Sequence, residues 1–341
     1  MRPASNKEWI YAILNHKEGY DVPFHFTFTP LALEKITQYY GENFVEKLGF
    51  PIRMNSTKSI KPLYASPSLF GDSAIDEFGV VWSVNPIDRG TPFFHPLEHL
   101  PLKDYEIASA KFNYRFEGLN EWCEKEKDNF RIIWVGDLWE RAVFMRGMEN
   151  ILLDVAINKP FVRGLLRKLA DRILETMSIL FEKFDFEGIA VSDDYGAQQS
   201  LLISPTDWRE LIKPFLSEIY STAKVKGKTV FHHSCGHVIP IIRDMIEIGL
   251  DILHPIQPET MDIFYLKKEF GKDITFCGGV PTQTLLIRGT ADEIKNHVKH
   301  LKNEMGRNGG YILEPGITLQ ADVPLQNMVA MIEEAIKGNV Y

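Results

Sequence analysis

Several features are scarce in this sequence of 341 residues, and each scarcity excludes a class of protein. There are three cysteines, Cys123, Cys235 and Cys277, too few and too unevenly spaced for a disulfide framework, which fits a reducing compartment. The longest apolar runs fall far short of the ~20 residues that a membrane span needs. Residues 1–8 hold no apolar core of a secretory signal. We therefore expect a cytoplasmic protein with no membrane partner.

Positive charge is scarce as well. The chain has 38 Lys and Arg against 46 Asp and Glu, a net charge of −8. A protein that binds nucleic acid needs a basic face for the phosphates, so this balance argues against a nucleic-acid partner. Hydrophobic residues make up 45% of the chain and charged residues 25%, which is typical of a globular protein with a substantial core.

No glycine-rich phosphate loop follows the first predicted strand, so the main sign of a dinucleotide-binding sheet is missing. The chain instead alternates apolar, strand-like segments with amphipathic, helix-like segments, and no linker interrupts them. About eight such units predict a single-domain α/β fold over residues 1–341, a (β/α)8 TIM-type barrel with N-terminal additions. A doubly wound open sheet is the alternative. The predicted strands are 22–28, 78–84, 130–135, 188–191, 228–233, 252–255, 274–277 and 311–313, and the predicted helices are 31–40, two within 150–184, 205–226, 239–248, 261–270, 291–305 and 323–336.

An imidazole and a thiol stand two residues apart where the predicted strand 228–233 ends. In an extended segment, residues i and i+2 point to the same side, so His233 and Cys235 can aim at one point while His232 faces the other way. Cys277 also follows a short apolar strand. One His and two Cys at strand ends predict a soft-metal site, with zinc as the first choice. The alternative is that the cysteines are small buried hydrophobic residues.

Other strand ends carry similar chemistry. In a parallel barrel the active site lies at the carboxyl ends of the strands. Nearly every predicted strand of this chain ends in a residue with acid–base or ligand chemistry, a density that a purely structural barrel does not need. These residues are His25, Thr27, Asp137, Asp193, Asp194, Tyr195, His233, Cys235, His254, Gln257, Cys277 and Glu314.

Short motifs spread over most of the chain carry a resemblance to a known family. They are SDDYG (192–196) with ISP (203–205), HSCG (233–236), GLDILHPIQ (249–257), CGGV (277–280), VPLQN (323–327), and DEFG (76–79) with VW (81–82). Together they resemble the uroporphyrinogen decarboxylase superfamily, and within it the zinc-dependent corrinoid methyltransferases of the methylcobalamin:coenzyme M methyltransferase type. The resemblance implies a TIM-type barrel, in agreement with the alternating pattern.

The resemblance also implies a metal site. In the methyltransferase branch a His-x-Cys pair binds zinc together with a cysteine on the last barrel strand, and His233 and Cys235 match that pair. The last-strand cysteine is absent, and LEPGI (313–317) stands in its place. Catalytic zinc normally has three protein ligands. We therefore expect Cys277, from the neighbouring strand, or Glu314, through an oxygen, to complete the site.

By the same resemblance, the expected reaction moves a methyl group between a corrinoid and a thiol or other small acceptor. A methoxylated aromatic or a folate is left open as the methyl donor or acceptor. The Asp-x-His-x-x-Gly motif of corrinoid-binding domains is absent, so a separate corrinoid protein is expected as the partner. A homodimer is compatible with the sequence.

We assign catalytic roles to Asp193, Asp194 and Tyr195, because an aspartate there could orient a ligand histidine or accept a proton. The alternative for the two aspartates is an N-cap or turn position before Gly196. Substrate binding is assigned to residues at other strand ends. These are His25, Asp137, His254 and Gln257.

Three other functions stay open. The first is the decarboxylase itself, which in the family binds a polycarboxylate tetrapyrrole through an N-terminal arginine-rich motif. The first 50 residues here contain only Arg2, which argues against that substrate. A metal-free lyase acting on a small acid would use Asp193 as the acid–base group and Arg141 as the carboxylate anchor. A non-catalytic binding subunit is suggested by the missing last-strand cysteine.

Overall fold

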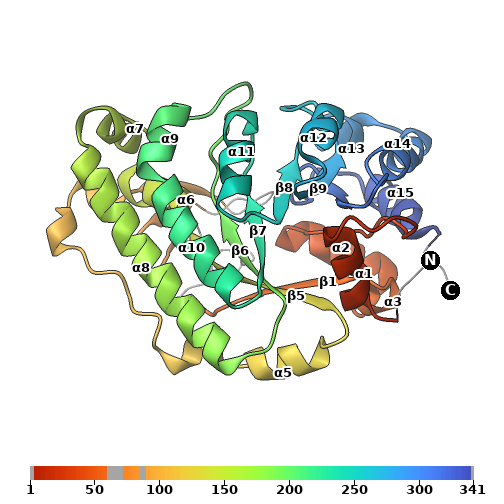
Figure 1. Ribbon diagram of the computed structural model, residues 1–341, viewed down its shortest axis with the longest axis horizontal. Coiled ribbons are helices and arrows are strands. Elements are labelled where there is room, and N and C mark those ends of the chain that lie inside the picture. Colours follow the sequence, from red (N-terminus) through yellow and green to blue (C-terminus); the bar gives the residue numbers. More distant parts are fainter. Residues whose placement is uncertain (1–3, 60–71, 84–89, 339–341) are drawn as a thin grey trace.

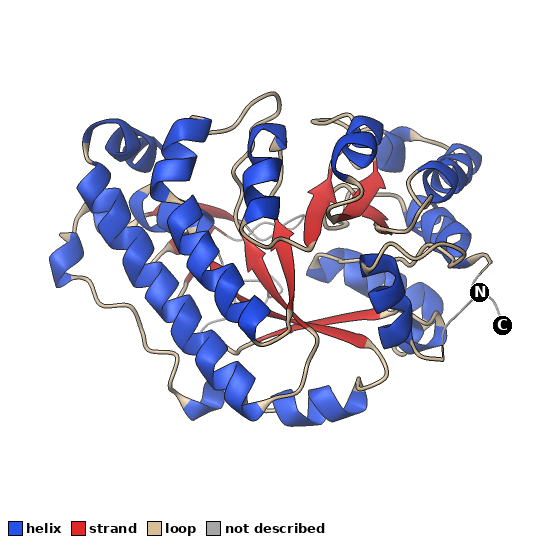
Figure 2. Ribbon diagram, viewed as in Figure 1, coloured by secondary structure: helices blue, strands red, loops and turns tan. Residues whose placement is uncertain are grey.

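A curled sheet of seven parallel strands forms the centre of the molecule (Figures 1 and 2). The computed structural model describes residues 4–59, 72–83 and 90–338. The strands are hydrogen-bonded in chain order, without the reversal of order that defines a doubly wound sheet. The TIM-type fold is therefore confirmed. In their order across the sheet the strands are β1 (Ile52–Ser56), β5 (Phe130–Asp137), β6 (Gly188–Ser192), β7 (Thr229–His233), β8 (Ile252–Ile256), β9 (Thr275–Val280) and β10 (Tyr311–Pro315).

An extended segment occupies the place beside β10, where the sequence predicts the strand 22–28. It is joined to the β10 side by two isolated parallel bridges, Phe24 to Leu313 and Phe28 to Leu319, and not by a continuous ladder. Pro23 has no N–H to donate, but its carbonyl accepts from the N–H of Leu313 at 2.8 Å. The ring of Phe24 packs edge-on against Phe50, just before β1, with the centroids 5.4 Å apart. The segment thus lies between the last strand and the first.

Helices cover the outside of the sheet, and long α8 and α10 run side by side along one flank (Figure 1). A parallel sheet must be covered on its outer face because its strands are apolar on both sides. The helices after β5 are α6 (Trp139–Arg146), α7 (Met148–Ile157), α8 (Lys159–Lys183), α9 (Pro205–Leu211), α10 (Lys213–Val225), α11 (Ile239–Glu247), α12 (Ile263–Phe270), α13 (Leu285–Arg288), α14 (Ala291–Glu304) and α15 (Leu325–Ile336).

One predicted helix is wrong in its continuity. The segment 205–226 forms two helices, because Pro214 in the first turn of α10 has no N–H to continue the hydrogen bonding of α9. Ser204 is the N-cap of α9, since its hydroxyl accepts from the N–H of Asp207 at 3.0 Å. The two helices predicted within 150–184 are confirmed as α7 and α8, which are separated at Asn158.

The additions before β5 include elements that the sequence pattern did not reveal, among them β1. The predicted strand 78–84 is realised as β3, and position 84 lies outside the described residues. Asp76 ties this region to the barrel, because its carboxylate accepts from the Arg141 guanidinium of α6 at 2.7 Å. The added elements are α1 (Asn6–Leu14), α2 (Pro30–Tyr40), α3 (Phe44–Lys47), α5 (Leu119–Lys125), three 3-10 turns (Pro96–Glu98, Leu102–Asp104 and Asn113–Phe116) and an antiparallel sheet of β2 (Ser73–Ile75), β3 (Val81–Ser83) and β4 (Thr91–Phe94).

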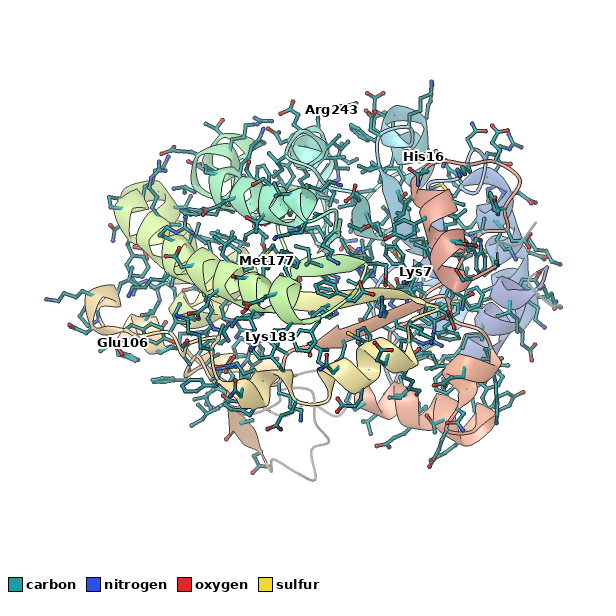
Figure 3. The ribbon with its side chains drawn as sticks, turned by 60° about the horizontal axis from the view of Figure 1, so that its bottom comes forward. Lys7, His16, Glu106, Met177, Lys183 and Arg243 are labelled. Atoms are coloured by element: carbon teal, nitrogen blue, oxygen red, sulfur yellow. The ribbon has the colours of Figure 1, made fainter. Side chains whose placement is uncertain are left out.

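A buried ion network holds the amino-terminal ends of β5 and β6 together. The Arg131 guanidinium donates to both carboxylate oxygens of Glu187, at 2.9 and 2.8 Å, and to Asp185 at 2.9 Å. Lys7, labelled on α1 in Figure 3, contacts Glu187 at 2.7 Å. Arg131 also donates to the carbonyl of Cys123 on α5. The network therefore links two strands to two of the added helices.

Across the described ranges, no helix combines the length and the apolar character needed to cross a membrane.

Candidate metal centre

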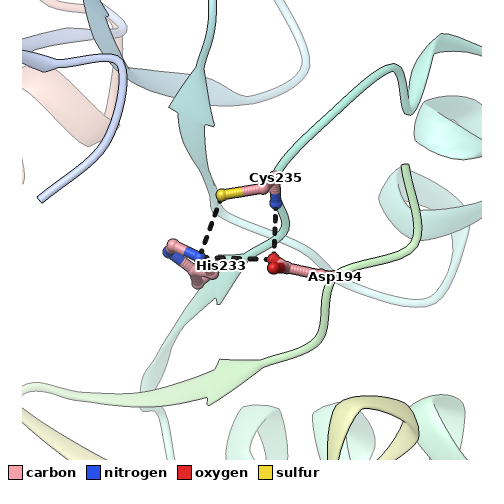
Figure 4. A group of neighbouring side chains, drawn as sticks. All are labelled: Asp194, His233 and Cys235. Carbon is pink, nitrogen blue, oxygen red and sulfur yellow. Dashed lines mark hydrogen bonds and ion pairs between the residues drawn. The ribbon is translucent and has the colours of Figure 1, made fainter. Parts of the chain in front are cut away.

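Three side chains with metal-ligand chemistry meet at the carboxyl end of β7 (Figure 4). His233 is the last residue of that strand, Cys235 follows two residues later, and Asp194 follows β6. The Nε2 atom of His233 lies 3.5 Å from the Cys235 Sγ and 3.4 Å from the Asp194 Oδ1. All three ligand atoms lie within 4.8 Å of one another. We call Asp194, His233 and Cys235 the outer group, since each is partly exposed at the barrel mouth.

The backbone around Cys235 is held tightly, which fixes the direction of the thiol. Gly236 has φ +82°, and a Cβ there would lie 2.3 Å from the backbone of Gly196, so only glycine fits this crossing of two loops. The N–H of Gly236 donates to Gln257 Oε1 at 2.6 Å. The N–H of Cys235 donates to Asp194 Oδ1 at 2.8 Å. Asp194 and Gln257 thus position the loop that carries the cysteine.

The side chains of the outer group shift one another's pKa values. Burial lowers the pKa of His233, but Cys235 and Asp194 outweigh burial and hold that pKa well above its usual range. Burial raises the pKa of the Cys235 thiol, and His233 offsets this only in part. A cation in place of the proton on His233 would favour the thiolate, since a positive charge beside a thiol lowers its pKa.

A second set of ligand side chains lies directly behind the first. His254 on β8, Cys277 on β9 and Glu314 on β10 are all buried, and their ligand atoms also lie within 4.8 Å of one another. Glu314 Oε2 is 3.0 Å from the Cys277 Sγ and 3.3 Å from His254 Nε2, and Glu314 Oε1 accepts from the Thr27 hydroxyl at 3.1 Å. We call His254, Cys277 and Glu314 the inner group.

The two groups touch through their histidines. The Nδ1 atoms of His233 and His254 are 2.9 Å apart, a hydrogen-bonding distance. Beside the inner group, His25 is 5% exposed and neither of its ring nitrogens has a hydrogen-bond partner in the part of the chain that the structure describes. The predicted ligands are therefore divided, with His233 and Cys235 in the outer group and Cys277 and Glu314 in the inner one.

Burial shapes protonation in the inner group. Burial lowers the pKa of His254, and Glu314 counters this only in part. Burial raises the pKa of Glu314, but His254 and His25 outweigh burial and bring it to about 2. Burial and Glu314 together raise the pKa of Cys277 well above its usual range. At neutral pH the inner group therefore holds a carboxylate, a neutral imidazole and a protonated thiol.

Of the residues assigned to catalysis, Asp193 and Tyr195 face a different part of the structure from Asp194. Asp193 Oδ1 accepts from the N–H groups of Leu138 and Glu140, both at 2.9 Å, at the start of α6. Its Oδ2 accepts from the Tyr195 hydroxyl at 2.8 Å, and both side chains are buried. This is a cap of α6 supplied by another loop, close to the capping alternative that the sequence left open.

The structure also places His232 and Asp137. His232 faces away from the barrel interior, as the i to i+2 alternation predicts, and its Nδ1 is 2.7 Å from the Tyr220 hydroxyl on α10. Asp137, at the end of β5, is paired with Arg141 at 2.9 Å. Asp137 and Arg141 line a cavity of about 580 Å³ together with Trp134, whose ring lies edge-on to His233 with the centroids 6.5 Å apart.

Comparison with known proteins identifies the family of this chain. The model of the family described as uroporphyrinogen decarboxylase (URO-D) matches residues 104–337, which is more than half of the chain. The chain belongs to the uroporphyrinogen decarboxylase family. The matched residues include both the outer and the inner group, whereas His25 and Thr27 precede them. No curated protein sequence matches the chain.

Solved structures show how far the family fold extends. A methyltransferase from Methanosarcina mazei covers 98% of this chain and 99% of its own, with 19% identity and a TM-score of 0.68. At that identity the likeness shows a shared fold over nearly the full length. A putative vitamin-B12 independent methionine synthase from Listeria monocytogenes covers 95% of this chain and 100% of its own, with 13% identity and a TM-score of 0.44, too low to support an argument.

The donor set of this member of the uroporphyrinogen decarboxylase family suits zinc. The outer group offers one imidazole nitrogen, one thiol sulfur and one carboxylate oxygen, which are the three ligand types of protein zinc sites. Its partial exposure leaves room for a further ligand, as catalytic zinc sites require. Sequence reasoning assigned Asp194 to catalysis and did not place it with the candidate metal ligands. The order of the strands could have indicated that Asp194 lies near His233, because β6 pairs with β7 and their carboxyl ends lie together.

Proposed function

We propose that this chain is a zinc-dependent methyltransferase that moves a methyl group between a corrinoid, held by a separate corrinoid protein, and a thiol or other small acceptor. The outer group carries the proposal, because nitrogen, sulfur and oxygen ligands converge at the barrel mouth where enzymes of this fold place their active sites. Asp194, His233 and Cys235 would hold the metal. Zinc bound there would lower the pKa of a substrate thiol, so that a thiolate is present at neutral pH.

The protein's own residues would prepare the site for that substrate. Asp194 holds the N–H of Cys235 and lies against His233, so one carboxylate orients both neighbouring ligands. The 580 Å³ cavity has the size of a small-molecule site, and Trp134 in its wall lies against His233, so an acceptor or a donor bound there would lie on the far side of Trp134 from His233. An aromatic wall there would exclude water from the reacting group.

The metal-free lyase finds less support in the contacts. Its proposed anchor, Arg141, is buried and already bound to two carboxylates, Asp76 at 2.7 Å and Asp137 at 2.9 Å. Its proposed acid–base group, Asp193, is fully buried and its oxygens accept from the start of α6 and from Tyr195. A substrate carboxylate would have to displace partners on both sides.

The test is the zinc content of the purified protein by elemental mass spectrometry, in the wild type and in single alanine variants. We expect about one zinc per chain in the wild type, as for a catalytic site with three protein ligands. Cys235→Ala and Asp194→Ala should lose it, and Cys277→Ala should keep it. Cys123→Ala is the matched control, a buried cysteine on α5 outside both groups.

Activity is then assayed as methyl transfer from free methylcobalamin to 2-mercaptoethanol. Zinc in the wild type with thiol methylation that disappears in Cys235→Ala supports the proposal. A wild type that takes up no zinc, even when zinc is supplied, contradicts it. Full methyl transfer in chelator-treated protein contradicts the role of the metal.

A further inference from the structure

A line of buried polar contacts leads from the outer group into the barrel. His233 Nδ1 lies 2.9 Å from His254 Nδ1, and His254 Nε2 lies 3.3 Å from Glu314 Oε2. His254 is 3% exposed and Glu314 is fully buried, so water does not compete for these contacts. The three residues come from β7, β8 and β10, and their positions are set by the sheet.

His254 Nε2 meets Glu314 Oε2 in a close polar contact and not in an aligned hydrogen bond, and the position of each proton follows from the chemistry of the contacting atoms. A carboxylate can only accept, so the proton between Glu314 and His254 belongs to His254 Nε2. A neutral imidazole carries one proton, so His254 Nδ1 is then an acceptor. The proton between the two rings must come from His233 Nδ1. In its neutral form His233 then has its lone pair on Nε2, and Nε2 is the atom that faces Cys235 and Asp194.

We propose that His254 and Glu314 are positioning residues that fix His233 in the tautomer whose Nε2 faces the metal ligands. The proposal rests on the proposed function in one respect, which is that the outer group binds zinc. Ligand histidines commonly donate their second N–H to a carboxylate or carbonyl, which fixes the ring and raises its basicity. Here the donation reaches the carboxylate through a second imidazole.

Cys277 has a place in this arrangement that differs from a ligand. Its Sγ lies 3.0 Å from Glu314 Oε2, the oxygen that also faces His254. The thiol therefore donates to the carboxylate, and Thr27 donates to the other oxygen at 3.1 Å. Two hydrogen-bond donors and the His254 ring surround one buried carboxylate, which favours the ionised form of Glu314 that the line of contacts requires.

The experiment compares two substitutions of His254, one without a hydrogen-bond acceptor and one with an acceptor. His254→Leu removes the acceptor of the His233 proton. His254→Gln retains a carbonyl oxygen that can accept it, and so serves as the conservative rescue. Zinc affinity is measured by competition with a chromophoric chelator, and folding by circular dichroism and thermal unfolding. We expect His254→Leu to bind zinc 10- to 100-fold more weakly and His254→Gln to stay within about threefold of the wild type.

A second readout does not depend on zinc. In metal-free protein with ¹⁵N-labelled histidine, long-range ¹H–¹⁵N spectra report which ring nitrogen carries the proton. We expect His254, assigned by the signals that vanish in His254→Gln, to be protonated at Nε2 and free of a proton at Nδ1. A proton on His254 Nδ1 overturns the proposal. So does folded His254→Leu that binds zinc as tightly as the wild type.

The outcomes separate this proposal from the proposed function. Zinc binding with the expected loss in His254→Leu, but without methyl transfer, keeps the positioning role and contradicts the methyltransferase. If the wild type binds no zinc, the proposed function fails, and the tautomer of His254 alone decides whether the line of contacts exists.

Discussion

The two ends of the same barrel strands hold buried charge in opposite ways. At the amino-terminal end, Arg131 and Glu187 saturate each other with two hydrogen bonds, and Lys7 and Asp185 complete the set. At the carboxyl end, His25 is buried with no hydrogen-bond partner among the described residues, and the outer group brings an imidazole, a thiol and a carboxylate together. Paired charge resists change, whereas nitrogen, sulfur and oxygen ligands that converge on one point can share a metal ion. The comparison assigns stability to one end and chemistry to the other.

The pKa directions follow the same division. Burial raises the pKa of Glu187, but Arg131 and Lys7 outweigh burial and hold it below its usual range. In the outer group, by contrast, the pKa values of His233 and Cys235 both lie above their usual ranges. At neutral pH the amino-terminal network is therefore fully ionised and paired. The outer group retains a proton that a cation could replace.

Breaking the amino-terminal network should have the largest effect on stability. Arg131→Met leaves Glu187 buried without its main partner, and we expect a loss of about 3–5 kcal/mol in the free energy of unfolding. Zinc content should not change. The measurement is urea denaturation, with Arg307→Met as the control, because the Arg307–Glu304 pair is exposed and should contribute less than about 0.5 kcal/mol. A loss of zinc in folded Arg131→Met would break the division between the two ends.

Asp193 and Asp194 are adjacent in the chain, but we expect one to contribute to stability and the other to zinc binding. Asp193→Ala removes the cap of α6 and the acceptor of the buried Tyr195 hydroxyl, so we expect a loss of about 2–4 kcal/mol in stability with zinc retained. Asp194→Ala should do the reverse, with zinc lost and stability changed by less than about 1 kcal/mol. Denaturation and elemental analysis of the two variants decide the matter. Equal effects of both substitutions on zinc would contradict the separate roles.

Acid should weaken the amino-terminal end in a predictable direction. The pKa of Glu187 is lower in the folded state than in the unfolded state, so its contribution is present above the unfolded pKa and is lost as the pH falls through the folded one. Glu187→Gln should be less stable than the wild type at pH 7 and should lose less stability on going to pH 3. The measurement is the urea midpoint across that range. The exposed Glu304→Gln should follow the wild-type profile, and a wild-type profile in Glu187→Gln would refute the assignment.

Periodicity was enough to predict the barrel, and the alternation within β7 was enough to predict that His233 and His232 face opposite ways. Both rest on local geometry that every extended strand shares. The helix break at Pro214 was also local, but the apolar pattern on both sides of it concealed the break. The strand β1 escaped because its residues, Ile52–Ser56, include Arg53 and Asn55 and do not form a continuous apolar run.

The sequence alone could not predict which residues form the outer group and which form the inner group. Which cysteine joins which histidine depends on how far neighbouring strands are shifted along each other, and a shift of one residue turns a side chain to the other face. In β9 and β10, Cys277 pairs in register with Ile312, which brings Glu314 close to the thiol. Strand order places Asp194 near the end of β7, but its contact with the N–H of Cys235 depends on the loop crossing at Gly236, which no pattern of spacing reveals.

The most direct test of the account is X-ray absorption spectroscopy of the zinc-loaded protein, which counts the sulfur atoms bound to the metal. Zinc held by Asp194, His233 and Cys235 has one protein sulfur at about 2.3 Å, and the spectrum of Cys277→Ala should be unchanged. Two protein sulfurs per zinc, falling to one in Cys277→Ala, would place the metal between the outer and inner groups and contradict the account.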